Sequence, residues 1–206
     1  MTLSDLIDQL GEELVDPRYT HWSRESLLSY INQALGIMAI NLPHEFRVEQ
    51  TVNTDMGTVF LPGDALSLLS VISAGNRSVN YIDIAKLNQL DPDWRTRLGE
   101  PSSWTQAHRD VRAYSLYPTP TETVAVTHAY SAFKDLTEVD AFPIHAAYVA
   151  AVTDYVLYRA YGKDGQNASE QNKALTHLQA FNAAIGNDVR VTGQRKQVRE
   201  QSENKR

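Results

Sequence analysis

Residues 144–186 read IHAAYVAAVTDYVLYRAYGKDGQNASEQNKALTHLQAFNAAIG, and this stretch predicts two helices joined by a turn. In the first helix, apolar residues recur every three or four positions and share one face: Ile144, Tyr148, Ala151, Tyr155 and Tyr158. The second helix is expected to be capped by the N-x-x-E pattern of residues 167–170. Its apolar stripe is Ala174, Leu178, Phe181 and Ile185, and Gly186 predicts its end.

The start of the chain also has apolar residues at helical spacing. Thr2 and Asp5 have the spacing of a capping box, and leucines then recur at helical intervals until Asp16-Pro17. Ser23 is a good N-cap for a second helix, which Pro43 should end. The buried stripe of that helix is predicted to be Leu27, Ile31, Leu35 and Met38.

The sequence pattern in the middle of the chain is typical of β-structure. Three hairpins are predicted, in RVEQTVNTDMGTVFLP (47–62), LSLLSVISAGNRSVNYI (66–82) and SWTQAHRDVRAYSLYP (103–118), and VAVTHAYSAF (124–133) is one more strand. Between them, Asp83 predicts the cap of a short helix, IAKLNQL. We expect this region to be antiparallel.

Together these patterns predict an α+β fold. The N- and C-terminal helices should form a four-helix bundle, with an inserted antiparallel β-rich region and a flexible C-terminal tail. The expected divisions are 1–45 and 140–189 for the two halves of the bundle, 46–139 for the insertion and 190–206 for the basic tail. The tail carries too few apolar residues to bury a core of its own.

Charge is distributed unevenly along the chain. Residues 190–206 hold six basic and two acidic side chains, a net charge of +4, so that residues 1–189 carry −10 of the total of −6. An acidic body argues against a protein that grips duplex DNA with its folded surface. The basic tail suggests docking on an acidic partner.

No catalytic signature is present. The chain has no cysteine, no nucleophile-elbow motif, no phosphate-binding loop and no H-x-x-x-H zinc pattern. Asp91 and Asp93 flank a proline and resemble a carboxylate pair for a divalent cation, but an Asp-capped turn with Trp94 folded back is the favoured interpretation. We therefore expect no enzyme activity, no catalytic or metal site and no cofactor. The chain also has no apolar run that could span a bilayer and no basic leader, so we expect a soluble protein without membrane contact.

The run around residue 155 is rich in tyrosine and cations. Tyrosine is common at protein interfaces, because its ring is apolar and its hydroxyl is polar. The simpler interpretation is a helix whose rings pack inward. The alternative adds a subunit contact, for which the candidates are Tyr155, Tyr158, Arg159, Tyr161 and Lys163.

Four segments in this order resemble a known family. They are HWSRESLLSYINQAL (21–35), IDIAKLNQLDPDWR (82–95), RAYSLYPTPTETVAVTHAYSAF (112–133) and DYVLYRAYGKDGQNASEQNKALTHLQAFNAAIG (154–186). The order resembles the head-to-tail adaptor (connector) proteins of tailed bacteriophages, especially those with short tails. The resemblance extends over residues 3–186.

The resemblance implies a structural virion protein of the neck, assembled in the host cytoplasm. Such adaptors form a ring of about twelve subunits under the portal protein, extend the DNA channel and provide the platform for the tail or nozzle protein. Their C-terminal segment commonly reaches the portal, which makes Arg190, Arg195, Lys196 and Arg199 candidates for the portal interface.

The acidic body fits this role, because negative channel walls do not bind the genomic DNA that passes through them. Two alternatives remain: another neck or tail-completion protein without portal contact, and an accessory hydrolase whose site forms only in the folded chain.

Overall fold

The structure is a computed structural model that describes residues 1–107, 112–164 and 168–203. It divides the chain into two compact units. One is helical and contains residues 1–42 and 134–206, and the other is β-rich and contains residues 43–133. The predicted mixed α+β class is therefore confirmed, and each unit is described separately.

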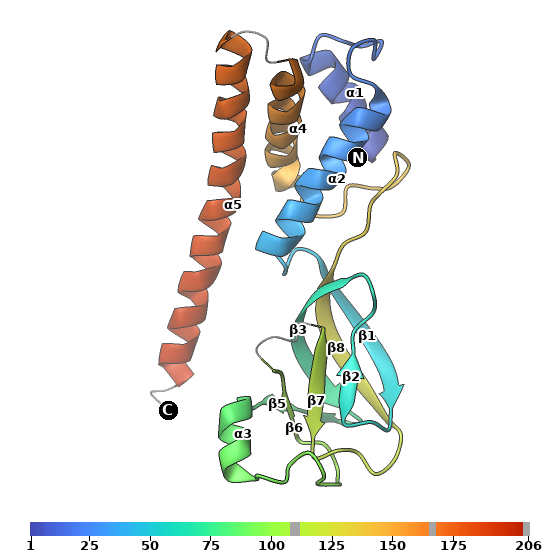
Figure 1. Ribbon diagram of the computed structural model, residues 1–206, viewed down its shortest axis with the longest axis vertical. Coiled ribbons are helices and arrows are strands. Elements are labelled where there is room, and N and C mark those ends of the chain that lie inside the picture. Colours follow the sequence, from blue (N-terminus) through green and yellow to red (C-terminus); the bar gives the residue numbers. More distant parts are fainter. Residues whose placement is uncertain (108–111, 165–167, 204–206) are drawn as a thin grey trace. The chain divides into compact units, whose positions relative to one another are not determined.

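The helical unit contains four α-helices among the described residues: α1 (Leu3–Glu13), α2 (Arg24–Asn41), α4 (Val149–Asp164) and α5 (Ala168–Glu203). A single 3-10 turn, η1 (Ala146–Tyr148), precedes α4. Helix α4 packs against α5 and α2, and α1 packs against α2. Figure 1 shows α4 lying between α5 and α2.

The predicted helix starts are confirmed. Thr2 and Asp5 form a complete capping box, in which each side chain bonds the other residue's backbone N–H. The Ser23 hydroxyl accepts a hydrogen bond from the backbone N–H of Ser26 at the start of α2. The predicted stripe of α2 is buried completely, because Leu27, Ile31, Leu35 and Met38 are all inaccessible to solvent. The cap expected at Asn167 lies outside the described residues.

The segment that returns from the β-rich unit belongs to the helical unit from Lys134 onward. The side-chain amide of Asn32 in α2 donates to the Leu136 carbonyl at 2.9 Å, and its oxygen accepts from the Leu136 N–H at 2.9 Å. Residues 134–139, which the sequence pattern placed with the β-rich insertion, are thus anchored on α2.

The described residues of the β-rich unit form two four-stranded sheets and one helix (Figure 1). The first sheet has the order β1-β8-β3-β4, and its strands are β1 (Arg47–Thr54), β8 (Val124–Ala132), β3 (Ala65–Ala74) and β4 (Arg77–Ser78). The second has the order β2-β7-β6-β5, and its strands are β2 (Thr58–Phe60), β7 (Ala113–Tyr117), β6 (Ser103–Thr105) and β5 (Asn80–Tyr81). Helix α3 (Ile84–Leu90) is capped by Asp83 as predicted.

Two of the three predicted hairpins are confirmed. Strands β3 and β4 pair around Gly75, whose φ of 60° suits glycine in the turn, and β6 pairs antiparallel with β7. The hairpin predicted for residues 47–62 is wrong: β1 pairs with β8, and β2 pairs with β7. The turn between β1 and β2 moves the chain from one sheet to the other. One strand pair, β5 with β6, is parallel rather than antiparallel.

The core of the β-rich unit is formed by apolar side chains from both sheets, including Val59, Val71, Leu116 and Val126. A polar group is buried beside it. The ring nitrogen Nδ1 of His128 lies 2.8 Å from the Tyr114 hydroxyl, and the ring packs against Tyr114 and Tyr130. Its other nitrogen, Nε2, has no hydrogen-bond partner among the described residues.

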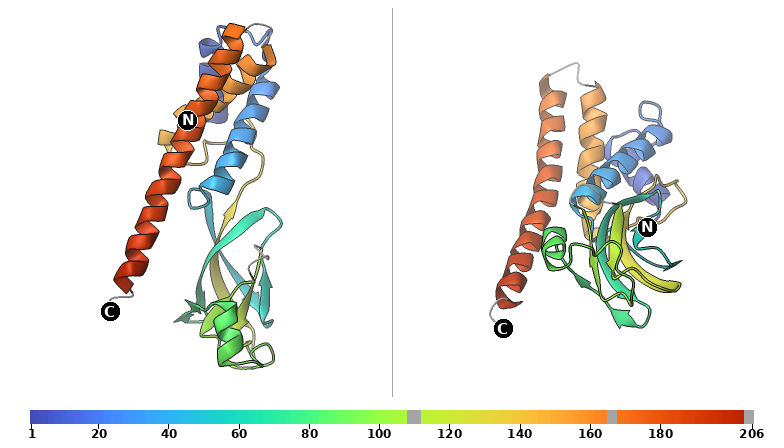
Figure 2. Two further views of the ribbon diagram at one scale, coloured as in Figure 1. Left: turned by 60° about the vertical axis from the view of Figure 1, so that its left-hand side comes forward. Right: turned by 60° about the horizontal axis from the view of Figure 1, so that its bottom comes forward.

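The C-terminal region corrects two predictions. Helix α5 does not end at Gly186 but continues to Glu203, so residues 190–203 are helical rather than a flexible tail. Figure 2 shows α5 as one unbroken helix in both views. A flexible tail was predicted because residues 190–206 lack a regular apolar stripe that could pack against a core. However, residues 194–201 are Gln, Arg, Lys, Val and Glu without a proline, and most of these residues favour helix locally.

Candidate assembly interface on the helical unit

Helix α4 carries the predicted subunit-contact residues. Tyr155 is only 7% exposed, and its ring centroid lies 4.9 Å from that of Phe181 in α5 and 5.8 Å from that of Tyr158. Tyr155 is therefore a core residue that joins α4 to α5. Its ring has little surface left for a second subunit.

Arg159 points toward α2. Its Nη1 donates a hydrogen bond to the side-chain oxygen of Gln33, and its guanidinium carbon lies 4.9 Å from the ring centroid of Tyr30. Cations over aromatic faces contribute about 0.5–1 kcal/mol at exposed sites. Arg159 thus has a role within the unit, while it remains half-buried.

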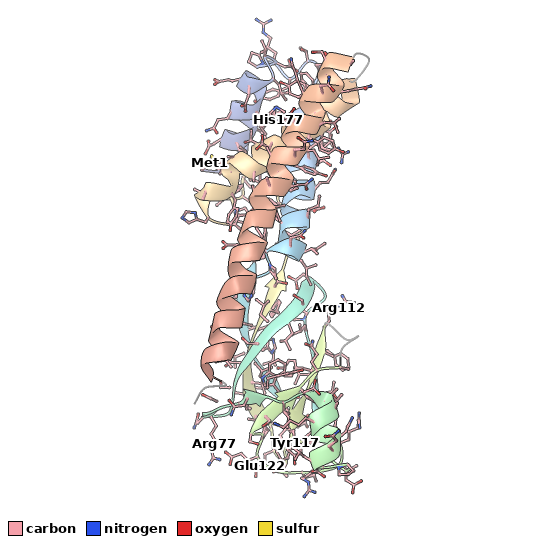
Figure 3. The ribbon with its side chains drawn as sticks, turned by 90° about the vertical axis from the view of Figure 1, so that its left-hand side faces the viewer. Met1, Arg77, Arg112, Tyr117, Glu122 and His177 are labelled. Atoms are coloured by element: carbon pink, nitrogen blue, oxygen red, sulfur yellow. The ribbon has the colours of Figure 1, made fainter. Side chains whose placement is uncertain are left out.

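Tyr161 belongs to a polar cluster between α4 and α5. Its ring stacks on His177 with a centroid distance of 5.8 Å, and the Lys173 ammonium lies 5.6 Å from the same ring. His177 (Figure 3) has its Nδ1 2.8 Å from an Asp154 carboxylate oxygen. These contacts tie the two helices together.

Lys163 is exposed near the end of α4. The structure therefore gives four of the five candidates contacts within the unit, with Tyr158, Arg159 and Tyr161 only partly buried. The simpler interpretation, in which rings pack inward, describes Tyr155. The subunit contact itself stays a prediction.

Helix α5 is much longer than its neighbour α4. With 36 residues against 16, α5 is about 54 Å long and α4 about 24 Å, at 1.5 Å per residue. The buried side chains described on α5 are Ala174, Phe181 and Ile185. Helix α5 continues for 18 residues, or about 27 Å, after Ile185, from Gly186 to Glu203.

The four portal-interface candidates all lie on this extension. Arg190, Arg195, Lys196 and Arg199 fall between Gly186 and Glu203 on the helical backbone. The apolar spacing that ends at Ile185 is not continued regularly beyond it. A helix that is polar on nearly all sides needs a neighbour or a partner to be stable.

The carboxylate pair at residues 91–93 is part of the structure of the β-rich unit. Asp91 accepts hydrogen bonds from Arg97 and from the Tyr117 hydroxyl at 3.0 Å, and the bond from Arg97 holds the pKa of Asp91 below its usual range. The Trp94 indole donates to the Asn88 side chain at 2.7 Å. Among the described residues, no three His, Asp or Glu side chains gather as a metal site would require.

One exposed residue, Val15, was not indicated by any sequence pattern. Val15 follows α1 with a φ of 56°, and its side chain is 87% exposed. Valine rarely adopts this left-handed conformation, because its branched Cβ crowds the backbone. Tyr19 has a similar φ of 55°, but its hydroxyl donates to Asp8 at 2.6 Å and Arg24 lies over its ring. The strain at Tyr19 is offset within the unit, whereas Val15 makes an exposed apolar protrusion.

The family model for SU10 adaptor protein matches residues 1–203, which is almost the whole chain. The chain belongs to this family of phage head-to-tail adaptors. The match includes both units and the extended α5, so the extension is part of what the family model describes. No curated protein sequence matches the chain.

Membership identifies a phage structural protein of an adaptor family rather than of an enzyme family. In the part of the chain that the structure describes, none of the helices combines the length and the apolarity needed to cross a bilayer.

Proposed function

We propose that this protein assembles as a ring beneath the portal in the virion neck, where it extends the DNA channel and forms the platform for the tail. The observation that carries the proposal is the basic C-terminal part of α5, in which the helix continues for about 27 Å after Ile185. A ring of about twelve copies would present the same number of parallel extensions to the portal.

The portal contact is assigned to Arg190, Arg195, Lys196 and Arg199. The acidic part of the chain, residues 1–189 with −10, does not favour docking on an acidic surface, whereas the +4 segment does. Because the extension has no regular apolar stripe of its own, contact with a partner would stabilise it. Binding to the portal would therefore stabilise the helical state of this part of α5 during assembly.

The subunit contact is assigned to the partly buried side of α4. A ring needs two different patches on each subunit, because every copy meets one neighbour on each side. Tyr158 and Tyr161, one helical turn apart, supply one patch, and Lys163 projects from a different side of α4. Val15 is a candidate for the second because its apolar side chain is exposed, although its left-handed backbone ends α1, where the Val15 and Asp16 N–H groups bond the Glu12 and Gly11 carbonyls. In this arrangement the four helices act as one bundle.

A binding experiment with purified portal rings tests the proposal. Deletion of residues 190–206 should abolish co-sedimentation with the portal, while the circular dichroism melting curve of the remaining chain is retained. The double variant Arg195→Glu/Arg199→Glu should weaken binding about tenfold or more, and Arg195→Lys/Arg199→Lys, which keeps the charge, should bind nearly normally.

Unchanged portal binding by the deletion variant would overturn the portal contact. The protein would then be a neck or tail-completion protein without portal contact. The channel role has a separate test. Residues 1–189 should bind duplex DNA only weakly at physiological salt, and submicromolar, strongly salt-dependent binding would contradict an acidic, non-adhesive channel.

A further inference from the structure

Strand β1 is a long edge strand that is open to a further strand. It pairs with β8 along all eight residues, from Arg47↔Ser131 to Thr54↔Val124. Among the described residues β8 is its only paired neighbour, and β1 is the outermost strand of its sheet in Figure 1. The backbone N–H and C=O groups that point away from β8 form a row ready for strand pairing.

The edge of β1 lacks the usual protection against pairing. Natural edge strands are interrupted by prolines, bulges or charges. The β1–β8 pairing has no register shift, whereas the β3–β8 pairing in the same sheet has three. β1 contains no proline or glycine, and its only two charged side chains, Arg47 and Glu49, pair with each other. Residues 50–54 are uncharged.

We propose that the free edge of β1 receives an extended, uncharged segment of a second virion protein on the tail side, as an added strand. The proposal rests on the ring described above. The neutral edge selects an uncharged segment, because a charged strand would find no counter-charge along residues 50–54. Val48 and Val52 share one face of β1 and favour β-branched or aromatic residues opposite them.

A second copy of this chain is a poorer occupant. Within the described part of the chain, the other sheet edges are β4 and β5 with two residues each and β2 with three, too short to match a strand of eight. Pairing of β1 with β1 of another copy has two-fold symmetry, so it closes a dimer instead of continuing around a ring. We therefore assign the edge to a different polypeptide.

Hydrogen exchange in intact particles is the direct test. Backbone N–H groups alternate in direction along β1, so about half of them point away from β8 and exchange quickly in the free protein. In tailed particles, peptides covering residues 47–54 should become protected, whereas in tailless particles they should exchange as in the free chain. Peptides from β8, which has neighbours on both sides, serve as the internal control.

A matched pair of variants distinguishes an effect on strand addition at the edge from an effect of charge on the exposed face of the sheet. Asn53 and Ala125 are both exposed and lie opposite each other in the register, one on the edge strand and one on the interior strand. Asn53→Lys should weaken tail attachment about tenfold, because an edge lysine opposes strand addition. Ala125→Lys places the same charge on the same face and should leave attachment within about twofold of wild type.

Three results would overturn the proposal: fast exchange of residues 47–54 in tailed particles, equal loss of attachment in both variants, or a dimer of the free protein that Asn53→Lys abolishes. The last result would assign the edge to self-pairing. Protection of β1 in tailed particles together with failure of the portal experiment would instead support strand addition and refute the portal contact.

Discussion

Arg24 and Glu138 lie 114 residues apart in the chain and meet in the helical unit, where Arg24 Nη2 and Nε lie 2.7 Å and 2.9 Å from the same Glu138 oxygen. The other Arg24 nitrogen, Nη1, bonds Asp8 in α1 and the Tyr19 hydroxyl. One guanidinium therefore joins α1, α2 and the segment that returns from the β-rich unit.

Arg24→Ala should lower the free energy of unfolding by about 1 kcal/mol, because the half-buried Glu138 carboxylate loses its charged donor, whereas the exposed Asp8 adds little. Urea denaturation measures the change. Arg47→Ala is the control, since the exposed pair of Arg47 and Glu49 should contribute less than about 0.5 kcal/mol. Equal effects of the two variants would show that Arg24 does not join these segments energetically.

Val15→Gly should stabilise the free protein by about 1 kcal/mol, because glycine adopts the φ of 56° without strain. Tyr19→Gly should destabilise it, since the Tyr19 side chain is engaged by Asp8 and Arg24. If Val15 contacts a neighbouring subunit, Val15→Gly should at the same time weaken ring assembly, as measured by sedimentation. A variant that is more stable and assembles normally would exclude Val15 from the interface.

Phe181→Ala should cost about 3–5 kcal/mol in a thermal or urea melt, because the side chain is 1% exposed and packs on Tyr155. Leu178 on the same stripe is only partly buried, so Leu178→Ala should cost less. Leu175→Ala, at a position that is 54% exposed on the same helix, should change stability by less than about 0.5 kcal/mol. A melt of Phe181→Ala that matches wild type would mean that the stripe does not form the core.

Gly186→Ala should stabilise α5 by about 0.5–1 kcal/mol, because a Cβ added there meets nothing within 4 Å and alanine favours helix. Gly11→Ala is the contrasting variant, since a Cβ there would lie 3.0 Å from the Tyr19 ring. Helicity measured by circular dichroism should rise in the first and melting temperature should fall in the second. Loss of helicity in Gly186→Ala would support a helix end at residue 186.

Burial lowers the pKa of His128 below its ordinary value of 6.5. Below about pH 6.5 the unfolded chain therefore binds a proton that the folded chain does not bind, and stability falls as the pH decreases. Above that pH the group contributes no pH dependence. Unfolding free energies at pH 7.5 and 5.5 should differ more for wild type than for His128→Gln, and equal differences would show that His128 is not responsible.

Local patterns in the sequence predicted much of the secondary structure. The capping box of Thr2 and Asp5, the Ser23 cap, the buried stripe of α2 and the turn at Gly75 depend on residues within a few positions of one another. The same local reasoning failed for residues 190–203, because it treated the missing apolar stripe as decisive although the residues themselves favour helix.

Only part of the candidate site could be predicted from the sequence. The resemblance of four segments indicated the adaptor family, and the family match over residues 1–203 agrees with it. The contacts of Tyr155 with Phe181 and of Arg159 with Tyr30 depend on the packing of three helices. Periodicity assigns a residue to a helix face, but it does not say which neighbour covers that face.

The sequence by itself determined where the helices begin, most of the strands, the charge asymmetry and the family of this protein, because each depends on residue type or short-range spacing. Only the tertiary structure decided that β1 pairs with β8 rather than with β2, and that Arg24 meets Glu138. These are contacts between distant parts of the chain. Many such pairings are compatible with one local pattern, and the choice among them depends on how the whole core packs.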